Sequence, residues 1–346
     1  MLDKRRLPTI GSSSCHLIFV LALTFTGCVF FSYHNAYQVF TVLPANVMNN
    51  PGYFLIPPGN STEYSPPYTT SELEIGDETT LIDLKSFRFT MNHDMCNNTQ
   101  PLLLMMIHSS PKNLQKRNVI RETWGRRSSL VTTLFLVGWS EEYKVELEEE
   151  DMKYGDLIQG NFLDAYRNMT YKHVMALKWA TYHCASAKYI LKLDDDVFVH
   201  VPAVLDFLKH HLSPWGARRL ILCDPLTAKV KRSYRSKWRV SPREYPRRHY
   251  PVYCAGWGIL YSPDTAFLLY REAQKEPYFW IDDVHITGTI AGKLNLTQVS
   301  LHSLVLTKEE KEYMLNDSAF FKEFLFGPPN LTENEIRALH SIVSRG

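Results

Sequence analysis

The stretch Lys188-Tyr-Ile-Leu-Lys-Leu193-Asp-Asp-Asp196-Val-Phe-Val199 decides the fold, because it joins a short, largely apolar run to three consecutive acids. A run of this length is typical of a buried strand. Similar runs stand at residues 102–107 and 134–137, and helical spacing of apolar residues marks residues 117–124 and 171–184. Strands that alternate with helices indicate an α/β fold with a parallel sheet. Ligands of such sheets bind at the carboxyl ends of the strands, so the three acids stand where a binding site is expected.

Asp194 and Asp196 can together anchor a divalent cation. Mg²⁺ and Mn²⁺ prefer hard oxygen ligands, and proteins commonly hold them with one or two carboxylates plus substrate phosphates. Three adjacent carboxylates also repel one another, and a bound cation relieves that repulsion. The alternative is a solvated acidic turn, but the position after a buried strand favours the cation site. A calcium EF-hand is excluded, because Phe198 and Val199 replace a ligand and the required glycine.

Composition bounds the class of protein. The 346 residues carry 38 lysines and arginines against 36 acids, a net charge of +2. At about 150 residues per domain, this length predicts two domains, or one large domain with appendages. Hydrophobic residues make up 45% and charged residues 21%, which is ordinary for a chain with a full-sized core. These values exclude wholesale disorder and a polytopic membrane protein, and the small net charge argues against a nucleic-acid partner.

The N-terminus predicts a membrane anchor. Lys4, Arg5 and Arg6 precede an apolar run, and residues 15–33 form 19 positions without a charge. That length is just enough to cross a thin bilayer as a helix, which suits a Golgi membrane. The basic cluster keeps residues 1–14 in the cytosol, so the rest of the chain faces a lumen. A cleaved signal peptide is the alternative, but the run ends in bulky aromatic residues rather than in an Ala-x-Ala site.

The remainder divides into a lumenal stem, residues 34–86, and one large α/β domain, residues 87–346. The stem is rich in Pro, Asn, Ser and Thr with little periodic hydrophobicity, so we expect an extended tether. N-glycosylation sequons agree with a lumenal face and occur at Asn60, Asn97, Asn168, Asn295, Asn316 and Asn330. The four cysteines beyond the span permit two disulfides with three possible pairings, and they are Cys96, Cys184, Cys223 and Cys254.

Five motifs occur in an order that resembles one enzyme family. They are Arg117-x-x-Ile-Arg121-x-Thr-Trp124, Phe135-Leu-Val-Gly138, Asp194-Asp-Asp-Val-Phe-Val199, Tyr250-Pro-Val-Tyr-Cys-Ala-Gly256 and Asp282-Asp-Val-x-x-x-Gly288. Together they resemble the β-1,3-glycosyltransferases of glycosyltransferase family 31, which include galactosyl- and N-acetylglucosaminyltransferases. Phe87-x-Phe89-x-x-Asn92-x-x-x-Cys96 and Asp164-x-Tyr-x-Asn168-x-Thr-x-Lys172 also resemble that family, so the resemblance spans about residues 87–300.

The resemblance implies a GT-A fold, a Rossmann-like α/β sandwich that binds a nucleotide sugar and Mn²⁺ or Mg²⁺. It implies an inverting transfer from a UDP-sugar (UDP-Gal, UDP-GlcNAc or UDP-GalNAc) to the 3-hydroxyl of a sugar on a lipid or protein. It also implies a single-pass type II protein of the Golgi membrane. A fringe-like N-acetylglucosaminyltransferase is an alternative of the same fold. A second alternative is a carbohydrate-binding or chaperone-like protein that has lost turnover.

Site residues follow from the matched motifs. The resemblance makes Asp196 the direct metal ligand, with Asp194 on the ribose or a metal-bound water and Asp195 supporting both. It makes Asp283 the general base, preceded by Asp282. The alternative for this acidic pair is a cap at a helix N-terminus, and both roles can hold at once. A late histidine often completes the metal site in GT-A enzymes, and His302 is the candidate here.

The remaining candidates concern the two substrates. Arg117 and Arg121 lie one turn apart on a predicted helix, where they meet either the donor phosphates or internal carboxylates. The acceptor side is expected to include Trp238, Tyr253 and Gly256. The sequence around Trp238 is strongly basic, which predicts either attraction of an acidic acceptor or a solvated loop, and the solvated loop is preferred.

Overall fold

The computed structural model describes residues 52–57, 68–96, 99–317 and 320–345. They lie in a compact unit that begins at Asn50. The predicted cytosolic tail, the predicted membrane span 15–33 and the sequons at Asn60 and Asn97 fall outside the described residues. Within the described ranges, every helix is too short or too polar to cross a bilayer.

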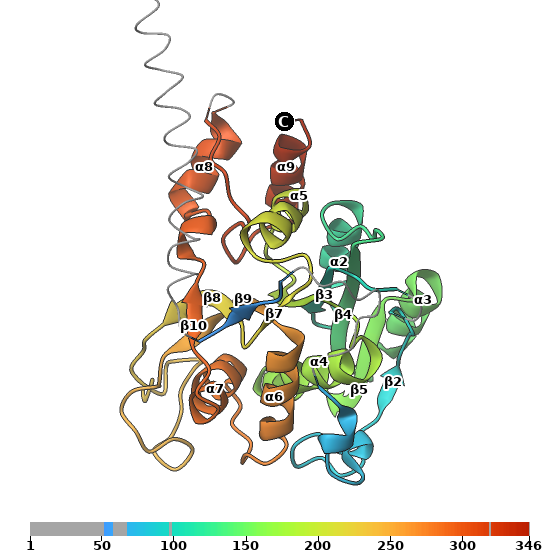
Figure 1. The fold of residues 1–346 in the computed structure, drawn as a ribbon, viewed down its shortest axis with the longest axis vertical. Coiled ribbons are helices and arrows are strands. Elements are labelled where there is room, and N and C mark those ends of the chain that lie inside the picture. The colour runs from blue at the N-terminus through green and yellow to red at the C-terminus, as the bar shows by residue number, and fades with distance from the viewer. Residues whose placement is uncertain (1–51, 58–67, 97–98, 318–319, 346) are drawn as a thin grey trace, which may run out of the picture. The chain divides into compact units, whose positions relative to one another are not determined.

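An eight-stranded mixed sheet forms the centre of the fold (Figure 1). Its strand order is β10–β8–β9–β6–β3–β4–β5–β2. The strands are β2 (Phe89–Met91), β3 (Leu103–His108), β4 (Val131–Trp139), β5 (Leu157–Leu163), β6 (Tyr189–Asp194), β8 (Ile221–Leu226), β9 (Tyr253–Tyr261) and β10 (Gln298–Ser300). A small second sheet pairs β1 (Phe54–Leu55) with β7 (Ala217–Arg218).

The pairing confirms the predicted parallel core and adds an antiparallel strand that shapes the site. β3 lies between β4 and β6, and both neighbours run parallel to it. β9 instead runs antiparallel to β6 and to β8. The N-terminal half of β9 therefore meets the carboxyl ends of β6 and β8. This reversal brings the Tyr253–Gly256 segment beside the acids that follow β6.

Helices cover both faces of the sheet. They are α2 (Leu114–Glu122), α3 (Lys144–Tyr154), α4 (Met169–His183), α5 (Val201–Asp206), α6 (Pro263–Ala273), α7 (Ala291–Lys293), α8 (Lys308–Asn316) and α9 (Glu333–Val343), with the π-helical segments η4 (Phe207–His211) and η5 (Val284–Ile290). α4, α6 and η5 share one hydrophobic core with the sheet. In Figure 1, α2 and α9 lie on the other side of the sheet from α4 and α6. All six residues of β3 are buried, as expected for a strand covered on both faces.

The folded part begins earlier than residue 87, which corrects the predicted stem boundary. Leu81 and Ile82 are buried in the core formed with α4 and α6. Asp77 is also buried, and its carboxylate accepts a hydrogen bond from the Tyr182 hydroxyl at 2.7 Å and lies 3.5 Å from Lys178 Nζ. The few apolar residues of this segment show no periodicity, but they pack against α4 and α6, about 105 and 192 residues further along the chain. Local pattern alone therefore assigned residues 68–86 wrongly to the stem.

The four predicted cysteines form two disulfides, Cys96–Cys184 and Cys223–Cys254. The second closes a loop whose ends are β8 and β9. Among the described sequons, Asn295, Asn316 and Asn330 are exposed. Asn168 is half-buried, and its side-chain amide donates to the Leu163 carbonyl at 2.8 Å.

Candidate active site

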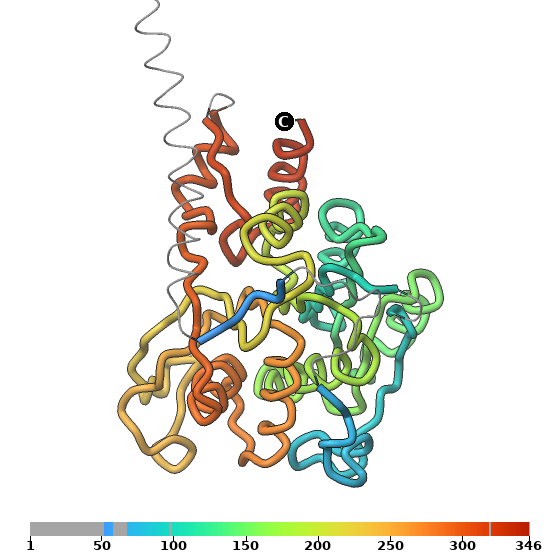
Figure 2. The backbone as a smooth tube through the Cα atoms, viewed as in Figure 1, coloured from blue at the N-terminus to red at the C-terminus, as the bar shows by residue number. Residues whose placement is uncertain are grey.

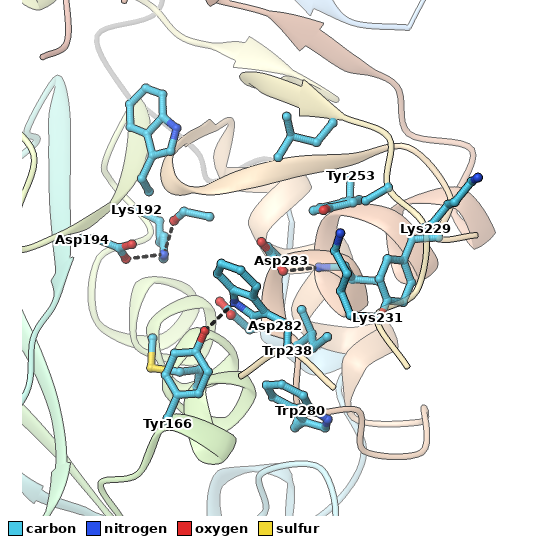
Figure 3. A pocket seen from close by; sticks show the side chains of 18 residues that line it. Tyr166, Lys192, Asp194, Lys229, Lys231, Trp238, Tyr253, Trp280, Asp282 and Asp283 are labelled. Carbon is cyan, nitrogen blue, oxygen red and sulfur yellow. Dashed lines mark hydrogen bonds and ion pairs between the residues drawn. The ribbon is translucent and has the colours of Figure 1, made fainter. Parts of the chain in front are cut away.

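A cavity of about 430 Å³ opens at the edge of the sheet where β6 ends and β9 begins (Figure 3). Asp194 from β6 and the pair Asp282 and Asp283 from the start of η5 line the same cavity. Its wall also includes Trp238, Tyr253 and Gly256, the residues predicted for the acceptor side. Asp196 lies two residues beyond Asp194 and is not among the lining residues. The two predicted acidic motifs therefore share one cavity through Asp194.

The three consecutive acids have different partners. Asp194 accepts from Lys192 Nζ at 2.8 Å, and that buried ammonium also donates to the Gly256 carbonyl. Burial raises the pKa of Asp194, and the charge of Lys192 opposes this. Asp195 points inward and accepts from Ser109 Oγ at 2.7 Å and Asn113 Nδ2 at 2.8 Å.

Asp196 is the least constrained acid of the three. Its side chain is 26% exposed, and Lys116 Nζ lies 3.8 Å from its Oδ2. A carboxylate held this loosely retains most of its acceptor capacity. Asp195 is used inside the protein, so a supporting role fits it and a direct contact with a ligand does not.

His173, on α4, lies fully buried behind Asp282. Its Nδ1 is 2.9 Å from Asp282 Oδ2, and its Nε2 is 3.1 Å from the Tyr261 hydroxyl. Burial lowers the pKa of His173, so the ring is neutral. An ionised carboxylate can only accept hydrogen bonds, so the Nδ1–H of His173 donates to Asp282. Nε2 then accepts a hydrogen bond from the Tyr261 hydroxyl. Burial works to raise the pKa of Asp282, but the bond from His173 and the charge of Lys192 outweigh it and lower that pKa.

Asp283 has the opposite electrostatic environment. Burial, followed by the negative charge of Asp282, raises the pKa of Asp283 to about 7. Its Oδ1 also accepts from the Val284 backbone N–H at 2.7 Å, which caps η5 as the sequence allowed. Two adjacent carboxylates with pKa values driven apart are typical of an acid–base site.

Gly256 lies against Asp283 in the middle of β9, not in a turn. A Cβ at this position would meet Asp283 Oδ2 at 3.3 Å and Asp283 Cβ at 3.4 Å. The absence of a side chain here leaves the Asp283 carboxylate free to face the cavity.

A loop between β8 and β9 forms the outer wall of the cavity, and we call residues 227–249 the basic loop. Trp238 Nε1 donates to the Tyr166 hydroxyl at 2.8 Å, which joins the loop to the segment before α4. Arg167 pairs with Glu244 at 2.5 Å in the same region. The Cys223–Cys254 disulfide ties the strands at the two ends of this loop. Figure 2 traces the loop in gold.

Arg117 and Arg121 do not face the cavity, which corrects their assignment to the donor. Arg117 is fully buried and forms a bidentate pair with Glu150, with distances of 2.8 and 2.6 Å. Arg121 pairs with Glu150 at 2.6 Å and with Asp156 at 2.7 Å. The internal-carboxylate alternative accounts for both, because each guanidinium already has the paired acceptors that its burial requires.

His302 follows β10 and lies at the same edge of the sheet as Asp194, with β8 and β9 between their strands. Its side chain is 76% exposed, and its Nδ1 lies 3.2 Å from Asp224 Oδ1. Within the described residues, His, Cys, Asp and Glu side chains form no cluster of three or more suited to a metal. The structure therefore does not bring His302 together with Asp194 and Asp196.

A divalent cation fits these residues only if its other ligands come from elsewhere. Asp196 offers an almost free carboxylate, and Asp194 offers the oxygen that Lys192 does not use. Mg²⁺ and Mn²⁺ commonly take one or two carboxylates and complete their shell with substrate phosphates and water. The two carboxylates fit a cation that completes its coordination with phosphates and water, and they do not form a closed site made of protein ligands alone.

Sequence reasoning missed Lys192, His173 and Tyr166. Lys192 stands within an apolar strand, and a lysine within a buried run is a signal for a paired charge. His173 lies on a helix whose apolar stripe gives no sign of a polar role, and its partner Asp282 is 109 residues away. Tyr166 lies inside the Asp164-x-Tyr-x-Asn168 motif, whose resemblance to the family implies no role for the tyrosine.

Comparisons with known proteins agree with the motif order. The family model described as Galactosyltransferase matches residues 115–302. Beta-1,3-galactosyltransferase 5 of Pan paniscus is 34% identical over 216 residues, covering 60% of this chain and 70% of that protein. UDP-GalNAc:beta-1,3-N-acetylgalactosaminyltransferase 1 of Homo sapiens is 33% identical over 229 residues, covering 63% and 67%.

Among solved structures, the galactosyltransferase LgtC with donor and acceptor sugar analogues covers 70% of this chain and 95% of that chain. The sequence identity is 8% and the TM-score 0.34, which is too low to assign the fold. The family match and the identity to relatives are independent of that score. Since the matched segment spans every one of the five motifs and more than half of the chain, the protein belongs to the galactosyltransferase family, glycosyltransferase family 31.

Proposed function

We propose that the protein is an inverting, metal-dependent β-1,3-glycosyltransferase of GT-A fold. It transfers a hexose from a UDP-sugar to the 3-hydroxyl of an acceptor sugar on a glycoprotein or glycolipid. Family membership and the two named relatives support the reaction class. The shared cavity of Asp194 and Asp283 is the single observation that carries the proposal.

Asp283 is the general base of this proposal. Its carboxylate lines the cavity, and its pKa of about 7 suits a group that takes a proton near neutral pH. It accepts the proton of the attacking 3-hydroxyl while the oxygen of that hydroxyl attacks the anomeric carbon. Asp282 keeps its negative charge beside the base, because His173 donates to it.

Asp194, which lines the cavity, and Asp196, two residues beyond it, would hold Mn²⁺ or Mg²⁺. A bound cation supplies Lewis-acid stabilisation of the negative charge that develops on the departing UDP. Lys192 keeps Asp194 in place and holds the start of β9 through the Gly256 carbonyl. The aromatic side chains of Trp238 and Tyr253 offer flat surfaces for the acceptor sugar.

The predicted anchor and stem support the proposal that this reaction occurs in the Golgi lumen, carried out by a single-pass type II membrane protein. The two disulfides and the exposed sequons agree with an oxidising lumenal compartment.

The test is transfer by the purified lumenal part in the presence of Mn²⁺. UDP-Gal, UDP-GlcNAc and UDP-GalNAc are each offered with a panel of acceptor sugars, and released UDP and product mass are measured. We expect one donor to react, and the Asp283→Asn variant to lose about 10²–10⁴-fold in kcat. Asp264→Asn, which changes an acid of α6 outside the cavity, is the control and keeps its activity.

Two results count against the proposal. Full activity in Asp283→Asn would reject the assigned base. Binding of glycans without turnover of any donor would favour the carbohydrate-binding alternative. Transfer of GlcNAc to protein-linked fucose would instead assign the fringe-like activity.

A further inference from the structure

The basic loop carries most of the positive charge near the site. Residues 227–249 contain nine lysines and arginines and one acid, Glu244, a net charge of +8 in a chain whose total is +2. Across the described residues, none of these nine cations forms an ion pair with a carboxylate. The one acid of the loop, Glu244, pairs with Arg167 from outside the loop. A surface this unbalanced favours an anionic partner.

Some of the nine cations have structural roles. The Arg232 guanidinium donates to the carbonyls of Val240, Tyr245 and Arg247 at 2.6–2.8 Å and so holds the loop together. Arg239 stacks over the Tyr234 ring, with 3.8 Å between the guanidinium carbon and the ring centre. These contacts fix the shape of the loop without neutralising its charge.

Lys229 and Lys231 are placed differently, because both line the cavity. They alternate with the buried Val230, so their side chains leave the same side of the chain. The bridge between Lys229 and His249 holds this stretch against the returning strand of the loop. Figure 3 shows both lysines on the side of the cavity that Tyr253 lines, across from Lys192 and Asp194.

The two ends of the cavity therefore differ in charge. The carboxylates at the β6 end have a neutralising partner in Lys192, and a divalent cation fits beside them. The loop end has an aromatic surface from Trp238 and two ammonium groups without a carboxylate partner among the described residues. An acceptor at that end meets an aromatic face and a pair of positive charges together.

We propose that the acceptor carries an anionic substituent, a sulfate ester or a sugar carboxylate, and that Lys229 and Lys231 bind it. This specificity rests on the proposed function, because it assigns the loop end of the cavity to the acceptor. The sequence favours a merely solvated loop, but the position of the basic loop in the cavity wall favours the alternative, attraction of an acidic acceptor. Both lysines are exposed, so each contributes modestly and the contribution decreases with salt.

The experiment compares three acceptors that share one core disaccharide: neutral, sulfated and sialylated. kcat/KM is measured for each at low and at physiological salt, with the donor that the first screen identifies. We expect one anionic form to exceed the neutral form by about tenfold at low salt, and the ratio to decrease as salt increases. The sulfated and sialylated arms separate the two sources of negative charge.

The double variant K229Q/K231Q tests the assignment. It should reduce the anionic-to-neutral ratio of kcat/KM to about one. K275Q changes an exposed lysine just beyond the end of α6 and should leave the ratio unchanged. Equal kcat/KM for all three acceptors in the unmodified protein would overturn the proposal while leaving the glycosyltransferase assignment intact. So would a double variant that raises the KM for the UDP-sugar and keeps the ratio, since the lysines would then contact the donor. Lack of transfer to any acceptor would overturn both.

Discussion

The pH dependence of transfer offers a quantitative test of the proposed base. If Asp283 must be ionised, its pKa of about 7 predicts an acid limb at that pH in kcat/KM. At pH 5 only about 1% of Asp283 would be ionised, so kcat/KM should be roughly a hundredfold below its plateau. A carboxyl with an ordinary pKa near 3.9 would leave the rate at pH 5 almost unchanged.

Asp282→Asn is the perturbation that tests the cause of the raised pKa. Removing the neighbouring negative charge lowers the pKa of Asp283, so the acid limb should move to lower pH. Charges several ångströms apart in a half-buried site interact by about 1–2 kcal/mol, which corresponds to a shift of roughly one pH unit. The Asn amide oxygen still accepts from His173, so the position of the side chain is kept.

The assay measures initial rates of UDP release from pH 5 to 9 at constant ionic strength and fixed Mn²⁺. Binding of UDP with Mn²⁺ is measured over the same range, which separates a loss of donor binding from a loss of the base. An unchanged rate at pH 5 in the unmodified protein would refute the reasoning. An acid limb that stays at pH 7 in Asp282→Asn would show that Asp282 does not set the pKa of Asp283.

Three further predictions address the surroundings of the base and the metal. His173→Leu removes the hydrogen-bond donor to Asp282 and should lower kcat about tenfold with little change in KM. His173→Asn restores a donor near the same point and should recover most of that rate. The pKa of Asp283 is higher in the folded state than in the unfolded state, so its ionisation destabilises the fold as pH rises from about 4 to about 7. Asp283→Asn should therefore raise the free energy of unfolding by about 2 kcal/mol at pH 8 and leave it unchanged at pH 4. Denaturant titrations at both pH values measure this difference. EDTA should abolish transfer and Mn²⁺ should restore it, and Asp196→Asn should raise the Mn²⁺ concentration needed for half-maximal rate; a rate independent of EDTA would remove the metal from the account.

The sheet centre was predictable because local pattern and final structure agree there. The apolar runs at 102–107, 134–137 and 188–193 became β3, β4 and β6, each buried on both faces. The position of the acids after β6 followed from that arrangement alone. The direction of β9 did not, because a strand carries no local signal of whether its neighbour runs parallel or antiparallel.

Long-range partners explain what the sequence left undecided. Residues 68–86 lack periodicity, yet Leu81 is fully buried against helices far away in the chain. Asp282 and Asp283 are adjacent residues of the same type, and the buried His173 that donates to Asp282 is a partner that the local sequence does not show. The sequence allows Arg121 to bind either a phosphate or carboxylates, and the fold places Glu150 and Asp156 beside it as ion-pair partners. In each of these cases, the role of a residue depends on which distant side chain is buried beside it.

The anomeric configuration of the first-formed product tests the central claim most directly. A single base on one side of the sugar and a departing UDP on the other require attack from the face opposite the leaving group. Proton NMR of the reaction with an α-linked UDP-sugar should therefore show a β-linked product at the earliest times, with a large H1–H2 coupling. An α-linked first product would contradict the assignment of Asp283 as a base that acts on the face of the sugar opposite the departing UDP.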